Sequence, residues 1–223
     1  MNVKSLGYRT DMIFHAFDGE IIDRGHYLVL RTPSNPTFYW GNFLLFAQPP
    51  GAGDLSVWTE MFAREIGVPP ETEHQVFGWD TVRGEEGVIQ PFLDAGFRRN
   101  HGVVLTCSEP RRPAAFPPAA VSVRTLKTDA EWEQVVELQV ASRDAEHEES
   151  SYREFRERQM ARYRRMIDAG LGDWCGAFAG NGSWRTWACF TRRRRPLPVG
   201  RDASRLPPPR HRQRTDRRSG SPS

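Results

Sequence analysis

Four carboxylates and a histidine lie close together at Asp144, Glu146, His147, Glu148 and Glu149. Carboxylates and imidazoles accept protons during group transfer, so such a group is a candidate general base. Runs of charge also form solvated loops that take no part in chemistry. Two interpretations therefore stay open. Glu146, Glu148 and Glu149 are candidates for a catalytic base, with the catalytic residue itself unknown, or this stretch is an acidic surface loop.

A second group of charged residues follows on what reads as one long helix over residues 151–169. Its arginines are close enough together to hold a phosphate, but Glu154 and Glu157 are interleaved with them, as on a solvent-facing helix. The arginines are Arg153, Arg156, Arg158, Arg162, Arg164 and Arg165.

The elements that would position these groups form a short α/β pattern. Asp129 is a candidate N-cap for a helix through residue 141, and apolar residues recur along it at helical spacing. Strands are expected over residues 121–126 and 174–179, on either side of the two helices. The inward-facing residues of the first helix are expected to be Trp132, Val135, Val136 and Val140.

An earlier part of the chain has a similar alternation. Asp54 is a candidate N-cap for a helix that ends before Gly67, with Leu55, Trp58 and Phe62 on one face. A second, short helix is expected over residues 88–95. Runs of apolar and β-branched residues bounded by turn residues predict strands. These strands are expected over residues 12–17, 27–31, 37–46, 75–79 and 103–107.

Composition divides the chain into four parts. Residues 1–108 and 121–180 are the two α+β units, and residues 109–120 are a proline-rich linker. Residues 181–223 have no periodicity and are expected to be a disordered tail. The net charge of +3 is uneven, because residues 180–223 carry +10 and the rest carries −7.

Three features together resemble the GNAT superfamily of acyl-CoA-dependent N-acyltransferases. Residues 48–53, Gln-Pro-Pro-Gly-Ala-Gly, resemble the family's loop between a strand and a helix, where backbone N–H groups approach the pyrophosphate of coenzyme A. Residues 92–97, Phe-Leu-Asp-Ala-Gly-Phe, resemble the end of the family's fourth helix. The strand–helix–helix–strand order of residues 121–179 is how such a domain opens.

The resemblance implies tandem GNAT-like units, with acetyl-CoA as acyl donor and a small-molecule or peptide amine as acceptor. The acidic stretch would then border the acceptor site. The loop residues that would contact coenzyme A are Gln48, Gly51, Ala52 and Gly53.

The first unit departs from the family pattern in three ways. Pro49 and Pro50 lack N–H donors, and Asp54 adds a negative charge. Phe92 stands where family members often carry a tyrosine that protonates the leaving thiolate. The first unit is therefore interpreted as degenerate, and the second unit as the working one.

The tail has the composition of a GC-rich gene translated out of frame. Suitable codons for residues 180–190, read from the last base of the Gly180 codon, give E-R-L-V-A-D-L-G-L-F, a strand-like run. Codons for residues 192–212, read from each second base, give a run that includes V-G-T-H-P-D-Y-R-R-R-G-I-G, which resembles the family's acetyl-CoA loop. A second one-base change near Thr191 connects the two frames. The second domain is thus expected to be truncated by a frameshift, with its activity impaired.

A different function class stays open: a non-enzymatic α/β binding module whose basic tail binds nucleic acid. The acidic body makes nucleic acid an unlikely partner, and the tail lacks an aromatic stacking platform. No apolar run approaches the roughly 18 residues that a membrane helix needs. The three cysteines, Cys107, Cys175 and Cys189, suggest neither disulfides nor a metal site, so a cytoplasmic protein is expected.

Overall fold

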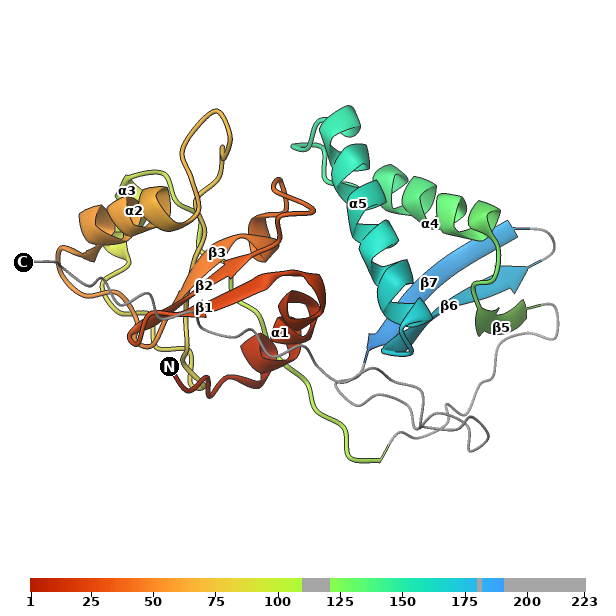
Figure 1. The fold of residues 1–223 in the computed structure, drawn as a ribbon, viewed down its shortest axis with the longest axis horizontal. Helices are drawn as coiled ribbons and strands as arrows, with labels where there is room; N and C mark the ends of the chain where they lie inside the picture. Colours follow the sequence, from red (N-terminus) through yellow and green to blue (C-terminus); the bar gives the residue numbers. More distant parts are fainter. Residues whose placement is uncertain (110–120, 180–181, 191–223) are drawn as a thin grey trace, which may run out of the picture.

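The computed structural model describes residues 1–109, 121–179 and 182–190, which form two α+β units (Figure 1). The first unit, residues 1–109, is built on a four-stranded mixed sheet, and the second, residues 121–190, on a three-stranded antiparallel sheet. The expected α+β class is therefore confirmed.

The sheet of the first unit has the strand order β1-β2-β3-β4. The first three strands pair antiparallel, and β4 pairs parallel with β3, with Leu44 opposite Phe77. Because a parallel pair needs a crossover connection, the chain between β3 and β4 passes through a helix. The strands are β1 (Glu20–Asp23), β2 (Tyr27–Arg31), β3 (Phe43–Phe46) and β4 (Phe77–Trp79).

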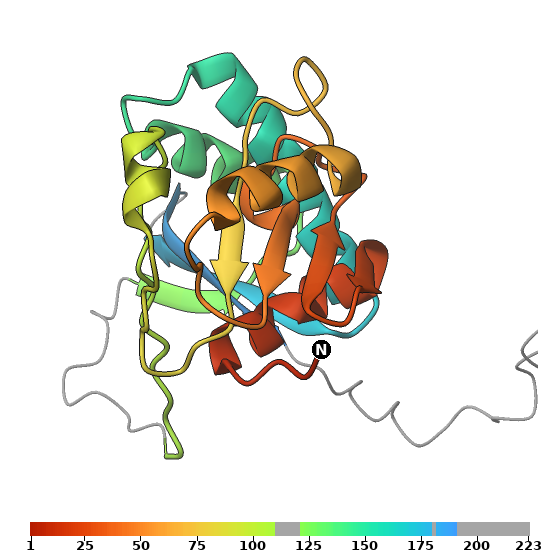
Figure 2. The ribbon, with the colours of Figure 1, turned by 90° about the vertical axis from the view of Figure 1, so that its left-hand side faces the viewer.

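Alternate residues of these strands contribute to two cores, one on each face of the sheet. One core packs Val29 and Leu44 against α2 (Asp54–Glu65) and the short α3 (Gln90–Asp94). Figure 2 shows α2 lying across this face. The other core packs Leu30 and Leu45 against α1 (Leu6–Asp18). Both faces are covered, which explains why residues 27–30 of β2 and the whole of β3 are apolar.

The second unit places two helices on one face of its sheet (Figure 1). Its strands are β5 (Val121–Thr125), β6 (Gly172–Ala179) and β7 (Gly182–Phe190), in that order and all antiparallel. Its helices are α4 (Asp129–Ala141) and α5 (Glu149–Asp168). The four predicted inward residues of α4 are all buried.

The strand expected over residues 12–17 is wrong, because these residues belong to α1. A short apolar run does not distinguish a buried strand from a buried helix. The residues that α1 buries are Met12 and His15, which lie three positions apart on one helical face.

Two further strand predictions need correction. The segment 37–46 contains a 3₁₀ turn (Tyr39–Gly41) before β3 begins. At Gly41 a β-carbon would lie 2.4 Å from a ring carbon of Phe38, so the turn requires glycine. Residues 103–107 form no strand, and Val103 and Leu105 are 74% and 90% exposed. Their composition favours a strand, but they pair with no strand of the described part of the chain.

The predicted loss of structure after residue 180 is wrong for residues 182–190, which form β7. Pairing with β6 stabilises this strand, including Gly172 opposite Phe190. Residues 191–223 and most of the predicted linker, 110–120, lie outside the described residues.

The helix starts also differ slightly from the predicted ones. The N-cap of α4 is Thr128 rather than Asp129, and Thr128 forms a reciprocal capping box with Glu131. Gly53, rather than Asp54, is the N-cap of α2.

Candidate functional site

The predicted coenzyme A loop connects β3 to α2, as expected for a strand–loop–helix motif. Gly53 precedes the helix with a φ of +84°, a conformation that favours glycine. The N-terminus of α2 therefore faces the loop, and backbone N–H groups at such a position attract anions.

The negative charge of Asp54 already occupies this helix end. An oxygen of its carboxylate accepts a hydrogen bond from the Gly51 N–H at 2.7 Å. Pro49 and Pro50 contribute no N–H, and the Pro50 carbonyl accepts a hydrogen bond from the Val88 N–H at 2.7 Å. A carboxylate in the first turn stabilises the helix by interacting with its dipole, and it repels a second anion. The residues present do not fit a pyrophosphate.

The position of the family's tyrosine belongs to the hydrophobic core. Phe92 is 7% exposed and its ring centroid lies 5.5 Å from that of Trp58 and 5.6 Å from that of Phe97. It offers no hydroxyl for proton transfer and no exposure to a substrate. Phe92 therefore stabilises the packing of α3 onto the sheet.

In the acidic stretch of the second unit, Glu148 is the N-cap of α5. Its carboxylate accepts hydrogen bonds from the Ser150 hydroxyl at 2.6 Å and the Ser150 and Ser151 N–H groups at 2.9 and 2.8 Å. These bonds, first of all the one from the Ser150 side chain, lower the pKa of Glu148 to about 2. A carboxylate with so low a pKa is a poor general base.

The neighbouring carboxylates are also paired. Glu146 accepts a hydrogen bond from Arg98 at 2.7 Å, which lowers its pKa, and Glu149 lies 2.9 Å from Arg143. The His147 ring stacks on Tyr152 at 5.4 Å. Each of the three candidate carboxylates is thus engaged by a different donor of the protein itself.

We expect the contribution of Glu148 to stability to depend on pH. Its folded-state pKa of about 2 lies below the ordinary 4.5, so this contribution is full above 4.5 and is lost as the pH falls toward 2. Glu148→Gln should lower the melting temperature at neutral pH, and its difference from the wild type should shrink through this window. Glu133 in α4 is the control, because its side chain is exposed. The melting-temperature difference between Glu133→Gln and the wild type should not shrink through this window. A difference for Glu148→Gln that is constant with pH would contradict the N-cap role.

Each arginine of α5 already has a partner within the protein. Arg153 pairs with Glu137, Arg158 with Glu154, and Arg164 with Asp129 at 2.6 Å. Arg162 and Arg165 both reach Asp18 of α1, and Arg156 donates to Gln159 and Tyr152. The interpretation of a purely solvent-facing stripe is wrong, because Arg162 is 2% exposed.

A charged cluster that the sequence did not reveal surrounds Glu65, at the end of α2. Its carboxylate is 6% exposed and accepts hydrogen bonds from Arg24, at 2.9 and 3.2 Å, and from the Tyr27 hydroxyl at 3.0 Å. The Arg24 hydrogen bond is the main reason that the pKa of Glu65 is lowered. Because Glu65 lies 41 residues from Arg24 and 38 residues from Tyr27 along the chain, no local pattern marks the cluster.

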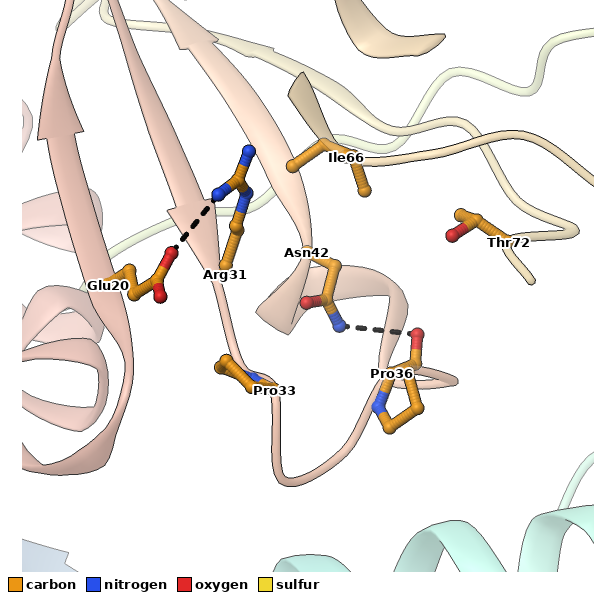
Figure 3. A pocket seen from close by; sticks show the side chains of 7 residues that line it. All are labelled: Glu20, Arg31, Pro33, Pro36, Asn42, Ile66 and Thr72. Atoms are coloured by element: carbon orange, nitrogen blue, oxygen red, sulfur yellow. Dashed lines mark hydrogen bonds and ion pairs between the residues drawn. The ribbon is translucent and has the colours of Figure 1, made fainter. Parts of the chain in front are cut away.

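A hollow of about 300 Å³ lies beside this cluster (Figure 3). Arg31 points into it, but its guanidinium donates to Glu20 at 3.2 Å and to the Glu65 carbonyl at 2.7 Å. The Asn42 amide donates to the Pro36 carbonyl at 3.3 Å. The polar side chains of Glu20, Arg31 and Asn42 in the hollow therefore already have partners within the protein.

Comparisons with known protein families, with curated proteins and with solved structures found no match. In the described ranges, no helix is long and apolar enough to cross a membrane, and no group of three or more His, Cys, Asp or Glu residues is placed to bind a metal ion.

Proposed function

We propose that this chain is a GNAT-type N-acetyltransferase in which the first unit is structural and the second unit carries the acetyl-transfer chemistry. One observation carries the proposal: the segment from β3 through the glycine loop to α2 and the parallel strand β4. This strand–loop–helix–strand order is the one that the GNAT resemblance predicts around residues 48–53, so it supports the proposed fold family. It does not make this loop a phosphate site, because Asp54 already accepts the hydrogen bond of the Gly51 N–H.

The chemistry of the loop supports the interpretation that the first unit is degenerate. The Asp54 carboxylate accepts the hydrogen bond of the Gly51 N–H. It also places at the helix end the negative charge that a bound pyrophosphate would bring. Phe92 is buried where a proton donor would be needed. We therefore assign the first unit a role in folding rather than in binding acetyl-CoA.

The reaction proposed for the second unit is direct transfer of an acetyl group. The amine nitrogen of the acceptor attacks the thioester carbonyl, a C–N bond forms, the C–S bond breaks, and the thiolate leaves with a proton. The nitrogen loses its proton to a base, and Glu146 and Glu148, whose pKa values are lowered, have too low an affinity for protons to serve well. The acceptor is a small-molecule or peptide amine.

Frame changes near residues 180 and 191 fit this proposal, since the second unit has only three strands in the described residues. The shifted reading would supply the phosphate loop that the chain lacks. We expect the gene to contain E-R-L-V-A-D-L-G-L-F in the frame that starts at the last base of the Gly180 codon. A nucleotide sequence without this run would eliminate the frameshift while leaving the first unit's assignment intact.

The chain itself is expected to bind acetyl-CoA poorly. In a thermal-shift titration, acetyl-CoA should leave the melting temperature unchanged, because ligand binding to the folded state would raise it. Asp54→Asn is the matched variant that removes the blocking charge, and it should restore little binding because Pro49 and Pro50 still lack donors. Clear stabilisation of the wild-type chain by acetyl-CoA would contradict the assignment of the first unit.

A further inference from the structure

The main contact between the two units is a surface in which α1 of the first unit faces α5 of the second (Figure 1). We call this surface the unit interface. It consists of Phe14, Asp18, Asn35 and Phe38 on the first unit, and of Phe155, Arg162, Tyr163, Arg165 and Phe190 on the second. The exposed Arg98–Glu146 ion pair is a separate contact between the units.

A buried arginine lies at the centre of the unit interface. The Nε of Arg162 lies 2.6 Å from an Asp18 carboxylate oxygen, and a second nitrogen of its guanidinium donates to the Phe14 carbonyl. Arg165 reaches the other Asp18 oxygen at 2.7 Å. A buried charge is costly unless it is paired and hydrogen-bonded. Both partners of Arg162 belong to the other unit: the Asp18 carboxylate forms the ion pair, and the Phe14 carbonyl accepts the hydrogen bond.

Aromatic packing surrounds this ion pair. The Phe14 ring lies 5.3 Å from Tyr163 and 5.2 Å from Phe190, in an edge-to-face arrangement with the latter. Tyr163 in turn contacts Trp174 in the core of the second unit at 5.5 Å. Phe14 therefore extends that core into the first unit.

A second contact between the units lies nearer the N-terminus of α5, at Phe155. The Asn35 amide donates to the Phe155 carbonyl at 3.1 Å, and the Phe38 ring lies 5.3 Å from the Phe155 ring. The turn that carries Asn35 and Phe38 is held by the buried Asn42, whose amide donates to the Asn35 and Phe38 carbonyls, each at 3.0 Å. Two separate contacts on one helix fix both its position and its direction.

We infer that the surface formed by α1 and the turn of residues 35–38 is a permanent docking site for α5 of the same chain, and that the two units unfold as one body. Independent domains joined by a linker meet through polar, loosely packed surfaces. Here the surface includes aromatic packing and an arginine that is 2% exposed. The inference concerns folding and does not depend on acetyl transfer.

The test is native-state hydrogen exchange of the full chain in increasing denaturant. Peptides from residues 6–18 and 149–168 should lose protection together. In Arg162→Met, protection of residues 6–18 should fall on the order of a hundredfold, although the substitution lies in the other unit, because Asp18 loses its buried partner. Arg158→Met is the matched control: its partner Glu154 is on the same helix and exposed, so residues 6–18 should keep their protection.

Asp18→Asn gives the reciprocal measurement and serves if Arg162→Met does not fold. It should lower the protection of residues 149–168 in the second unit. Unchanged protection of residues 6–18 in Arg162→Met, or of residues 149–168 in Asp18→Asn, would overturn the inference. So would two separate unfolding steps in the wild-type chain.

Discussion

Replacing Phe62 by alanine is expected to lower the free energy of unfolding by about 3–5 kcal/mol. Phe62 is fully buried between α2 and the first sheet, with its ring centroid 5.7 Å from Phe77 and 6.1 Å from His74. Removing the ring leaves a cavity in the core between α2 and the sheet, which the surrounding side chains cannot easily fill. Urea unfolding, followed by circular dichroism, measures the change.

Val57 on the same helix is the control for this experiment. It is 49% exposed, and Val57→Ala should change the free energy of unfolding by no more than about 0.5 kcal/mol. Similar losses for Phe62→Ala and Val57→Ala would mean that α2 does not pack on the sheet as described.

Replacing Glu65 by alanine is expected to cost about 2 kcal/mol of the free energy of unfolding. The change removes the acceptor of the buried Tyr27 hydroxyl and leaves Arg24 without its ion pair. The loss is smaller than for a wholly buried pair, because Arg24 is 45% exposed and water can solvate it. The pKa of Glu65 is lowered in the folded state, so its contribution is present above its ordinary pKa and disappears as the pH falls through the folded-state value.

The exposed Glu60 on the same helix is the matched control. Glu60→Ala should leave stability nearly unchanged, within about 0.5 kcal/mol. A Glu65→Ala protein that is as stable as Glu60→Ala, and as acid-sensitive as the wild type, would show that the charged cluster does not hold the end of α2.

The parts of the fold that were predictable from sequence are those whose local pattern agrees with their packing. Trp58 and Phe62 recur at helical spacing, and both are buried on one face of α2. Val136 and Val140 do the same in α4. The strand prediction for residues 12–17 was wrong because an apolar run of that length fits a helix and a strand equally well. Only the partner surface, here β2 and β3, decides between them.

The candidate site was predictable to the same extent. The GNAT resemblance implied a loop at residues 48–53 between a strand and a helix, and the structure confirms that placement. The hydrogen bond from the Gly51 N–H to Asp54 is also local, three residues apart, and the sequence already pointed to the charge of Asp54. The contacts of Glu65 and of Arg162 join residues far apart in the chain, and no spacing rule reports them.

The central claim is that acetyl-CoA binding belongs to the second unit and is missing from this chain. Calorimetric titration of acetyl-CoA into two proteins tests it most directly: this chain, and the chain translated in the shifted frames that begin at Gly180 and near Thr191. We predict heat of binding for the shifted chain and none for this one. Binding of equal strength by both proteins, or by neither, would contradict the account.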